Sequence, residues 1–431
     1  MRIPVIGLLG LLCLCGDTAW CQPPGGDDDI PPNELEQLSP PVAGDAMDGF
    51  PENNPDFDGE AAGAVFEQRL SDFRQAMAEM RTAMIYFNNL PASETEKWRQ
   101  RYRELEAVGR QHYDALFETA LELVLNVPRD YPQAAHFLLL ATHQRYNTDL
   151  YEMTGEAAEA LIRLQAADDK LEEIAGVSFF ATSQFDRAEP HLKRAREMGN
   201  LDPKFMGLAD TLDQCRQNWA EEVEYRKADA EANLPRVRLM TTRREIIVEL
   251  FEDQAPNTVA NFIALVEDEH YDLMPFYQVL PNQIALAGDP SSSPSQFSLP
   301  DEQNTEGGDR KIFRGSLVMA LLPNKEGVTR RTFANTAADQ FFFAYQPLPL
   351  GDPEHTVFGR IIDGMEYFSA FTPVNPTEED KEGPPVTPDR IISAEVIRKR
   401  DHPYVPNRID IPPYEMAARG GVPPLESQPG D

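Results

Sequence analysis

Cysteine is scarce in this sequence. The chain of 431 residues has four cysteines, and three of them (Cys13, Cys15 and Cys21) lie within the first 21 residues. Cys215 is the fourth, so no disulfide framework can be built over the rest of the chain. Zinc sites made of paired cysteines are excluded for the same reason, and no metal or cofactor is expected.

Positive charge is scarce as well. The chain has 39 Lys and Arg against 72 Asp and Glu, which gives a formal net charge of -33. Nucleic acid is therefore not expected as a partner, because binding it depends on basic surfaces that displace counterions from phosphate. Residues 22–61 contain 11 Asp or Glu and no Lys or Arg. With its prolines and glycines, this composition predicts a disordered linker over 22–62.

Long apolar runs are absent except at the N-terminus. After residue 21 no run approaches the roughly 20 apolar residues of a bilayer-spanning helix, so no membrane span is expected in the mature chain. Arg2 precedes the apolar run 3–15, and Ala19-Trp20-Cys21 places small residues at the two positions that a signal peptidase reads. These features predict a signal peptide over 1–21 and an exported protein, periplasmic or extracellular. A lipid anchor on Cys21 is an alternative that the bulky Trp20 disfavours.

Residues 63–232 follow a helical period. From Phe66 to Phe87, apolar residues recur at spacings of four and three, which predicts a helix with one narrow apolar seam. Ser93 and Glu96 form a capping-box pattern that begins a second helix. The two helices are expected to be antiparallel. The Met-rich seam is interpreted as core between them, with a docking groove as the alternative.

Alternating small and large apolar residues from Ile174 to Gly199 predict two closely packed helices. This segment resembles a tetratricopeptide repeat, whose positions are matched by Gly176, Phe179, Ala188, Leu192 and Ala195. Further helices are expected over 132–145 and 150–165, and as a pair over 206–215 and 219–230. Because a single repeat needs neighbours to cover its apolar face, we expect an all-helical tetratricopeptide-like domain. It is either a structural base or a concave surface that binds other proteins.

Beyond Pro235 the period changes from helical to alternating. Ile246, Val248 and Leu250 alternate as in a strand, and the helical period returns from Ala255 to Val266. Further strand-like runs occur at 312–322, 340–345 and 356–362. Short strands with few helices and many turns predict a closed β-barrel. From 400 to 431 the chain is rich in proline, and no fold is expected there.

Five segments occur in a characteristic order in the C-terminal half. They are TTRREIIVELFEDQAPNTVANFIALVEDEHYD, FYQVLPNQIALAGDP, RGSLVMA, NTAADQFFFAY and HTVFGRIIDGMEYF. In this order they resemble the cyclophilins, a family of peptidyl-prolyl cis-trans isomerases, over residues 235–399. The resemblance implies a closed antiparallel eight-stranded β-barrel with two helices, so the chain is expected to be a multidomain α + β protein. It also implies Pro-containing polypeptides as partners and chemistry without a cofactor.

The implied chemistry is rotation about an Xaa-Pro bond. Amide resonance opposes this rotation with a barrier of roughly 18 to 20 kcal/mol. In the twisted state the proline nitrogen regains its lone pair, so a strong donor beside it stabilises the transition state more than the ground state. The resemblance assigns this role to an arginine that follows Phe-His. Here the stretch is Phe276-Tyr277-Gln278, and the catalytic position is therefore held by Gln278, a neutral amide and a weaker donor.

The other positions of the implied proline-binding site mix retained and altered residues. The retained residues are Met319, Ala320, Gln340, Phe342 and His355. The altered ones are Gln283, Ile284, Leu286 and Leu350, and Leu321 replaces an asparagine of the family.

Three interpretations follow from this mixture. In the first, the domain binds proline but its isomerase turnover is reduced or lost. In the second, it catalyses isomerisation through another donor such as Arg330 or Arg331. In the third, Leu286 and Leu321 fill the recess and the domain is structural. We predict a family member that binds Pro-containing segments of exported proteins. The alternative is a non-enzymatic scaffold that uses both domains for protein contacts.

Overall fold

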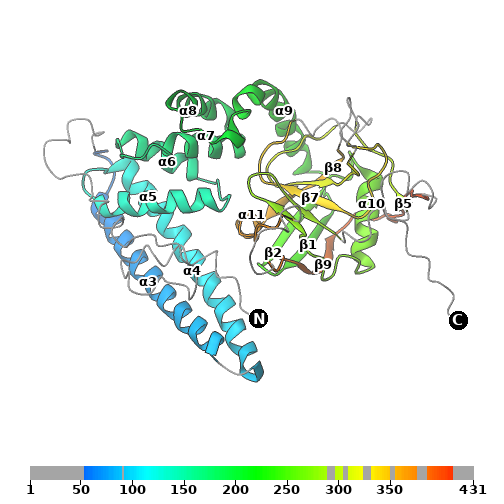
Figure 1. The fold of residues 1–431 in the computed structure, drawn as a ribbon, viewed down its shortest axis with the longest axis horizontal. Helices are drawn as coiled ribbons and strands as arrows, with labels where there is room; N and C mark the ends of the chain where they lie inside the picture. The colour runs from blue at the N-terminus through cyan, green and yellow to red at the C-terminus, as the bar shows by residue number, and fades with distance from the viewer. Residues whose placement is uncertain are drawn as a thin grey trace. The chain divides into compact units, whose positions relative to one another are not determined.

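A computed structural model of the chain describes residues 53–89, 92–288, 297–303, 309–323, 332–349, 355–375 and 386–410 (Figure 1). The predicted signal peptide with Cys21, the linker as far as residue 52 and the tail from 411 lie outside the described residues. So do Leu350, Arg330 and Arg331. Among the described helices, none combines the length and apolar character that a bilayer crossing requires.

The chain divides into two compact units. The first contains Met1–Ser178 and Pro190–Met206, and the second contains Phe179–Glu189 and Gly207–Asp431. The predicted boundary between the helical domain and the barrel lay near residue 232. The structure instead groups the last long helix with the strands that follow it.

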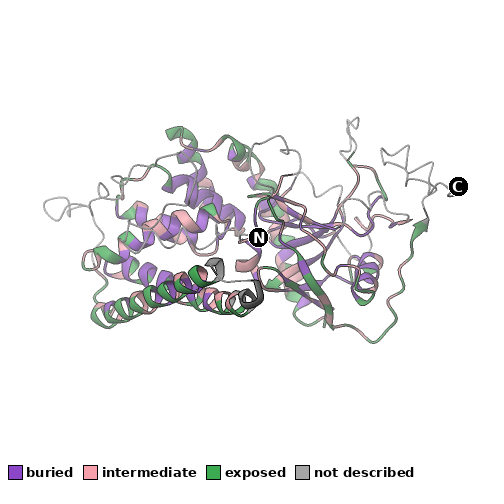
Figure 2. Ribbon diagram, turned by 60° about the horizontal axis from the view of Figure 1, so that its bottom comes forward, coloured by how far each residue is buried: buried purple, intermediate pink, exposed green. Residues whose placement is uncertain are grey.

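The first unit begins with a long helical hairpin. Helix α3 (Gly59–Asn89) lies beside helix α4 (Ala92–Asn126), and exposed and buried residues alternate along both (Figures 1 and 2). Four members of the predicted seam are buried: Phe66, Phe73, Met77 and Met80. The interpretation of the seam as core between two helices is therefore confirmed. Helices α5 (Pro132–Asn147) and α6 (Thr154–Arg163) follow.

The predicted close pair is formed by helices α7 (Leu171–Ala181) and α8 (Phe185–Met198). A Cβ atom on Gly176 would lie 2.9 Å from the backbone nitrogen of Leu192, so glycine is required for this approach. All five residues that match the tetratricopeptide positions are buried. The helices are confirmed, and the repeat assignment remains a prediction.

Helix α9 (Leu208–Asp229) replaces the two short helices that were predicted over 206–230. Residues 208–229 contain no Gly or Pro, so nothing in the sequence interrupts the helix. The expectation of a further helix pair was wrong at this point.

The second unit is built on an eight-stranded antiparallel sheet. Its strands are β1 (Arg236–Thr241), β2 (Glu245–Leu250), β3 (Gln278–Leu280), β4 (Ile284–Ala287), β6 (Ser316–Met319), β7 (Phe341–Ala344), β8 (Val357–Asp363) and β9 (Ile391–Arg398). Their spatial order is β3-β4-β7-β6-β8-β2-β1-β9.

The sheet curls so that its two edges approach each other. They meet at an isolated bridge between Pro275 and Arg390, where the Phe276 amide donates to the Asp389 carbonyl at 2.8 Å. Strands β3 and β9 do not pair along a ladder. The fully closed barrel of the prediction is therefore not confirmed, and the observed form is a curled antiparallel sheet.

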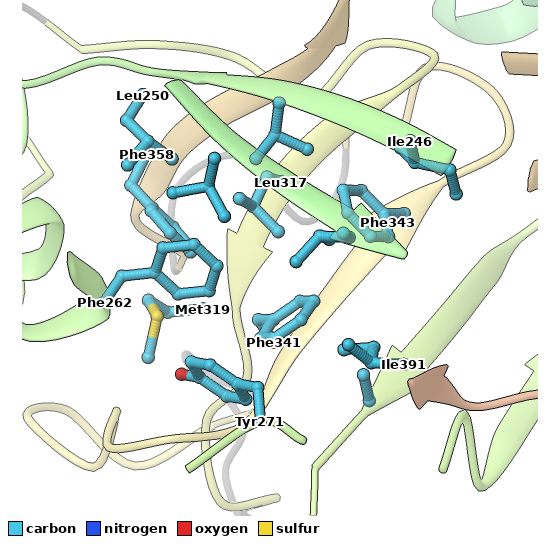
Figure 3. Close-up of a cluster of buried hydrophobic side chains, with 14 of the residues drawn as sticks. Ile246, Leu250, Phe262, Tyr271, Leu317, Met319, Phe341, Phe343, Phe358 and Ile391 are labelled. Carbon is cyan, nitrogen blue, oxygen red and sulfur yellow. The ribbon is translucent and has the colours of Figure 1, made fainter. Parts of the chain in front are cut away.

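Aromatic side chains fill the inner core of the curled sheet (Figure 3). Phe262, from helix α10 (Pro256–Glu267), meets the ring of Phe341 edge-on at 5.4 Å. Helix α11 (Met365–Phe368) places Phe368 against the Tyr345 ring, stacked at 4.2 Å. Because side chains alternate between the faces of a strand, the residues between these core positions point to the outer face.

The outer face carries a second apolar cluster, which we call the outer cluster. Its buried members are Leu234, Phe251, Ile312, Val318, Phe342, Ala344 and Val357. It forms the floor of the candidate site described below.

A buried arginine joins α9 to the sheet. The Arg310 side chain is fully buried, and it donates to Glu222 at 3.2 Å and to Asp229, both on α9. Its guanidinium lies over the Phe251 ring at 3.9 Å and over the Tyr225 ring at 4.3 Å. Burial raises the pKa of Asp229, and Arg310 opposes this shift. This network explains why α9 belongs to the second unit.

The chain continues to fold beyond residue 400, where no fold was expected. Strand β10 (Ile409–Asp410) pairs with β5 (Phe297–Ser298). The Asn407 amide donates to the Asn257 side chain at 2.6 Å, and the Tyr404 hydroxyl donates to Glu252 at 2.9 Å. The prediction failed here because these partners lie about 150 residues earlier in the chain.

Candidate functional site

Three site residues stand in one row across the sheet. Gln278 on β3 is opposite Leu286 on β4, and Leu286 is opposite Phe342 on β7. Directly opposed residues of antiparallel strands project from the same face, so all three side chains lie on the outer face. Phe342 belongs to the outer cluster, and Leu286 packs against that cluster. Gln278 is therefore set one strand away from the apolar floor.

Phe342 and His355 form the central ring pair of the site. Their rings meet edge-on with centroids 5.5 Å apart. The Nδ1 atom of His355 lies 3.1 Å from the Met319 carbonyl oxygen, so Nδ1 carries the proton and donates to it. Ile284 and Ala320 are half-buried against the outer cluster. Together these side chains make a mostly apolar wall whose histidine ring is held in place.

Tyr277 orients the Gln340 amide. Its hydroxyl donates to Oε1 of Gln340 at 2.9 Å. Burial raises the pKa of Tyr277 to about 12, with a smaller contribution from Asp339, so the hydroxyl stays protonated and remains a donor. Gly288 makes room for this amide, because a Cβ there would lie 2.7 Å from Cγ of Gln340. Sequence reasoning missed Tyr277. The signal was a hydroxyl-bearing aromatic residue immediately before Gln278.

Gln278 itself is half-buried at the start of β3. Its side-chain amide makes no hydrogen bond to another residue of the described segments. A glutamine here provides a neutral donor, and within the described part of the chain no hydrogen bond holds it. In that respect it differs from Gln340, whose orientation is set by Tyr277.

Two of the predicted binding residues do not join the site through their side chains. Met319 points into the inner core, because it alternates with Val318 along β6, and only its backbone carbonyl reaches His355 (Figure 3). Gln283 is exposed in the turn between β3 and β4, outside the row. The structure therefore does not bring these two side chains together with the others. Leu321 also packs against the inner core, so it does not fill the recess beside Phe342.

The remaining predicted residues converge. They are Gln278, Ile284, Leu286, Ala320, Gln340, Phe342 and His355. Within the described ranges, no three His, Cys, Asp or Glu side chains lie close enough to share a metal ion. The arrangement offers an apolar surface beside neutral amide donors, which suits a ring bound next to a peptide group.

Comparison with known proteins places this region in one family. The family model described as "Cyclophilin type peptidyl-prolyl cis-trans isomerase/CLD" matches residues 236–396. The chain is 31% identical over 167 residues to peptidyl-prolyl cis-trans isomerase-like 1 of Gibberella zeae, covering 38% of this chain and 95% of that relative. It is 29% identical over 160 residues to the isomerase ppi1 of Schizosaccharomyces pombe, covering 37% and 96%.

A cyclophilin type peptidyl-prolyl cis-trans isomerase of Cryptosporidium parvum is 26% identical, with a TM-score of 0.31, and the match covers 39% of this chain and 99% of that one.

The relatives correct the predicted localisation. They are fungal isomerase-like 1 and ppi1 proteins, which are not exported proteins. The prediction of an exported protein, periplasmic or extracellular, is wrong by this comparison. The segment on which it rested lies outside the described residues.

Proposed function

Because the chain belongs to the cyclophilin-type peptidyl-prolyl cis-trans isomerase family through residues 236–396, we propose that this domain binds Pro-containing segments of other polypeptides with reduced or lost isomerase turnover. The observation that carries the proposal is Gln278, half-buried in the same row as Leu286 and Phe342. The position where the family places a cation holds an uncharged side chain.

The loss of charge lowers catalysis more than it lowers binding. A hydrogen bond from a charged donor is about twice as strong as one between neutral groups. Removing one preorganised electrostatic donor from an active site costs about 10² to 10³ in rate. No described residue fixes the Gln278 amide by a hydrogen bond, so its contribution to the twisted state is further weakened. We therefore expect turnover well below that of relatives with arginine.

Binding of a proline ring depends on a different set of groups. Phe342, Ile284 and Ala320 supply apolar surface, and burying it contributes roughly 25 cal/mol per Å² without any charge. The Tyr277 hydroxyl donates to Oε1 of Gln340, so this amide is held in one orientation beside the apolar surface. Recognition can therefore persist where catalysis does not.

Two measurements on the full chain test the proposal. Titration calorimetry with a Pro-containing peptide reports binding, and a protease-coupled assay with the same peptide reports isomerisation. Wild type and Gln278→Ala should bind the peptide with equal affinity, and their slow isomerisation rates should agree within about twofold. Wild-type turnover tenfold or more above that of Gln278→Ala would contradict the reduced role of Gln278. Phe342→Ala serves as the binding control and should abolish the calorimetric signal.

A non-enzymatic scaffold is the second candidate, and one observation favours it. Phe342 is only 6% exposed, and Leu286 packs against its cluster, so the floor of the site is already largely covered. If Leu286 occupies the space of the proline ring, no Pro-containing peptide will bind. A Leu286→Ala variant would then open the recess and create binding that wild type lacks.

A further inference from the structure

The distal half of the α3–α4 hairpin is covered on fewer sides than its base. At the base, helix α5 contacts the hairpin through the rings of Phe66 and Phe137, and through the ion pair of Asp114 with Arg145 at 2.9 Å. Toward the tip, among the described residues of 75–105, the Tyr86–Trp98 ring stack and the Glu79–Arg101 ion pair join α3 to α4, and Arg101 also pairs with Glu104 within α4. A long two-helix arm therefore extends from the first unit (Figure 1).

A groove lies along this distal half. Its volume is about 320 Å³, and it is lined by Ala78, Thr82 and Ala83 of α3 and by Trp98 and Leu105 of α4. The small side chains of α3 let another helix approach closely, while Trp98 forms a wall. A space of this size is large enough for one or two bulky side chains. Nothing among the described residues occupies it.

Exposed apolar side chains continue the groove toward the tip. Ile85 and Tyr86 follow Thr82 by three and four residues, so they share its side of α3. They are 54% and 47% exposed, and the Tyr86 ring stacks on Trp98 at 4.5 Å. A contiguous apolar strip beside a groove marks an interaction surface rather than scattered surface hydrophobics.

The charges around the groove are balanced, unlike those of the chain as a whole. Residues 75–105 contain five Lys or Arg and four Asp or Glu, whereas the full chain has a net charge of -33. Two copies of the chain can therefore approach at this surface without strong repulsion. The rim holds one acid and one base, Glu79 and Arg101, which are 3.5 Å apart and about half exposed. A rim with one charge of each sign is self-complementary across a two-fold axis.

We propose that the groove is the interface with a second copy of this chain. The distal halves of two hairpins pack against each other as a four-helix bundle. The two copies are related by a two-fold axis, which is the commonest symmetry of protein dimers. In such an isologous interface Glu79 of one copy faces Arg101 of the other, and the reverse pair forms at the symmetric position. Tyr86 and Ile85 of each copy cover the groove of its mate. Helix α3 has 31 residues and is about 46 Å long, so its distal half is long enough for an interface of ordinary size.

Sedimentation velocity of the full chain over a dilution series tests the proposal. We expect wild type to be a dimer that dissociates on dilution. Tyr86→Glu and Thr82→Glu, both at exposed positions, should each raise the dissociation constant at least tenfold. Val65→Glu, an equally exposed apolar position near the base of α3, is the matched control and should leave dimerisation unchanged. Circular dichroism of each variant confirms that the helices remain folded.

Charge reversal tests the pairing itself. Glu79→Arg alone places like charges opposite each other and should weaken the dimer, and Arg101→Glu alone should do the same. The double variant, Glu79→Arg with Arg101→Glu, should restore wild-type affinity. A wild-type chain that stays monomeric at all concentrations overturns the proposal, and this result would favour a helix of another protein as the occupant. A dimer that all the groove variants leave unchanged overturns it as well.

Discussion

Replacing Gln278 with arginine tests how much catalysis one side chain controls. Gln278 is half-buried at the start of β3 and has no hydrogen bond to another described residue, so Gln278→Arg removes no described interaction. The longer side chain can pack its methylene groups against Leu286 while its guanidinium stays near solvent. The domain is therefore expected to tolerate the substitution.

The expected gain follows from the cost of losing such a donor. Supplying a preorganised cation should raise kcat/KM by about 10² and at most about 10³. The lower figure is the better expectation, because the amide of Gln340 accepts from Tyr277 and is not free to orient the new guanidinium through Oε1. Adding Tyr277→His, which completes the Phe-His-Arg stretch of the family, should release that acceptor and increase the rate further.

The protease-coupled isomerisation assay measures this gain. The rise should appear in kcat, with the affinity for the peptide changed little, because the cation acts in the twisted state. Gln278→Lys is the matched control for charge without the planar donor geometry, and it should give a smaller gain. If Gln278→Arg folds and binds peptide but leaves kcat/KM at the wild-type value, the reasoning about this position is refuted. A wild type as fast as arginine-containing relatives would refute it equally.

Three further predictions concern the fold. Arg310→Met removes the fully buried partner of Glu222 and Asp229, which keep ion pairs with Arg226 and Arg360. The free energy of unfolding of the second unit should therefore fall in a denaturant titration by about 1 to 3 kcal/mol, less than the about 3 to 5 kcal/mol expected for a buried charge with no partner. A loss below about 1 kcal/mol would show that the network is not structural. Gly176→Ala should lower the free energy of unfolding by about 1 to 3 kcal/mol through overpacking, whereas Gly207→Ala should be nearly neutral because nothing described lies within 4 Å of the added Cβ. Thermal melts that fail to separate the two variants would contradict the close approach of the helices. The Arg400 guanidinium lowers the pKa of Asp253, so the stabilisation from this ion pair is present above about pH 4 and is lost as the pH falls through the folded-state pKa. Because the pair is partly exposed, the effect is below about 1 kcal/mol, and Asp253→Asn should make the free energy of unfolding less steeply dependent on pH in acid. Identical pH profiles of the wild type and the variant would count against the pair.

The candidate site shows which parts of a prediction can be read from local patterns. The resemblance located Gln278, Phe342 and His355, and the structure places the first two in one row and the third against Phe342. It also named Met319, whose side chain turned out to lie in the inner core. A motif gives positions along the chain, and the alternation of strand β6 decides which face each position takes. Gln283 was misplaced because a motif does not show where a strand gives way to a turn.

Other features depended on partners that are distant in the sequence. The Tyr277–Gln340 bond spans 63 residues, and the contacts of Arg310 with α9 span 81 and 88. No local period signals such pairs. For this reason α9 was assigned to the helical domain, and the segment after residue 400 was expected to have no fold.

The sequence by itself determined that the chain would have a helical part and a strand part, that the second belongs among the cyclophilins, and that the uncharged Gln278 stands where the resemblance assigns an arginine. These properties can be read from the identities of single residues and from the spacing of apolar residues, every second residue in strands and about every fourth in helices. Both are local features of the chain. The tertiary structure decided which side chains share a face, that α9 is held to the sheet through a buried arginine, and that the described edge strands meet at the Pro275–Arg390 bridge and not along a ladder. Those outcomes depend on burial and on pairing between distant segments, and both exist only once the chain has folded.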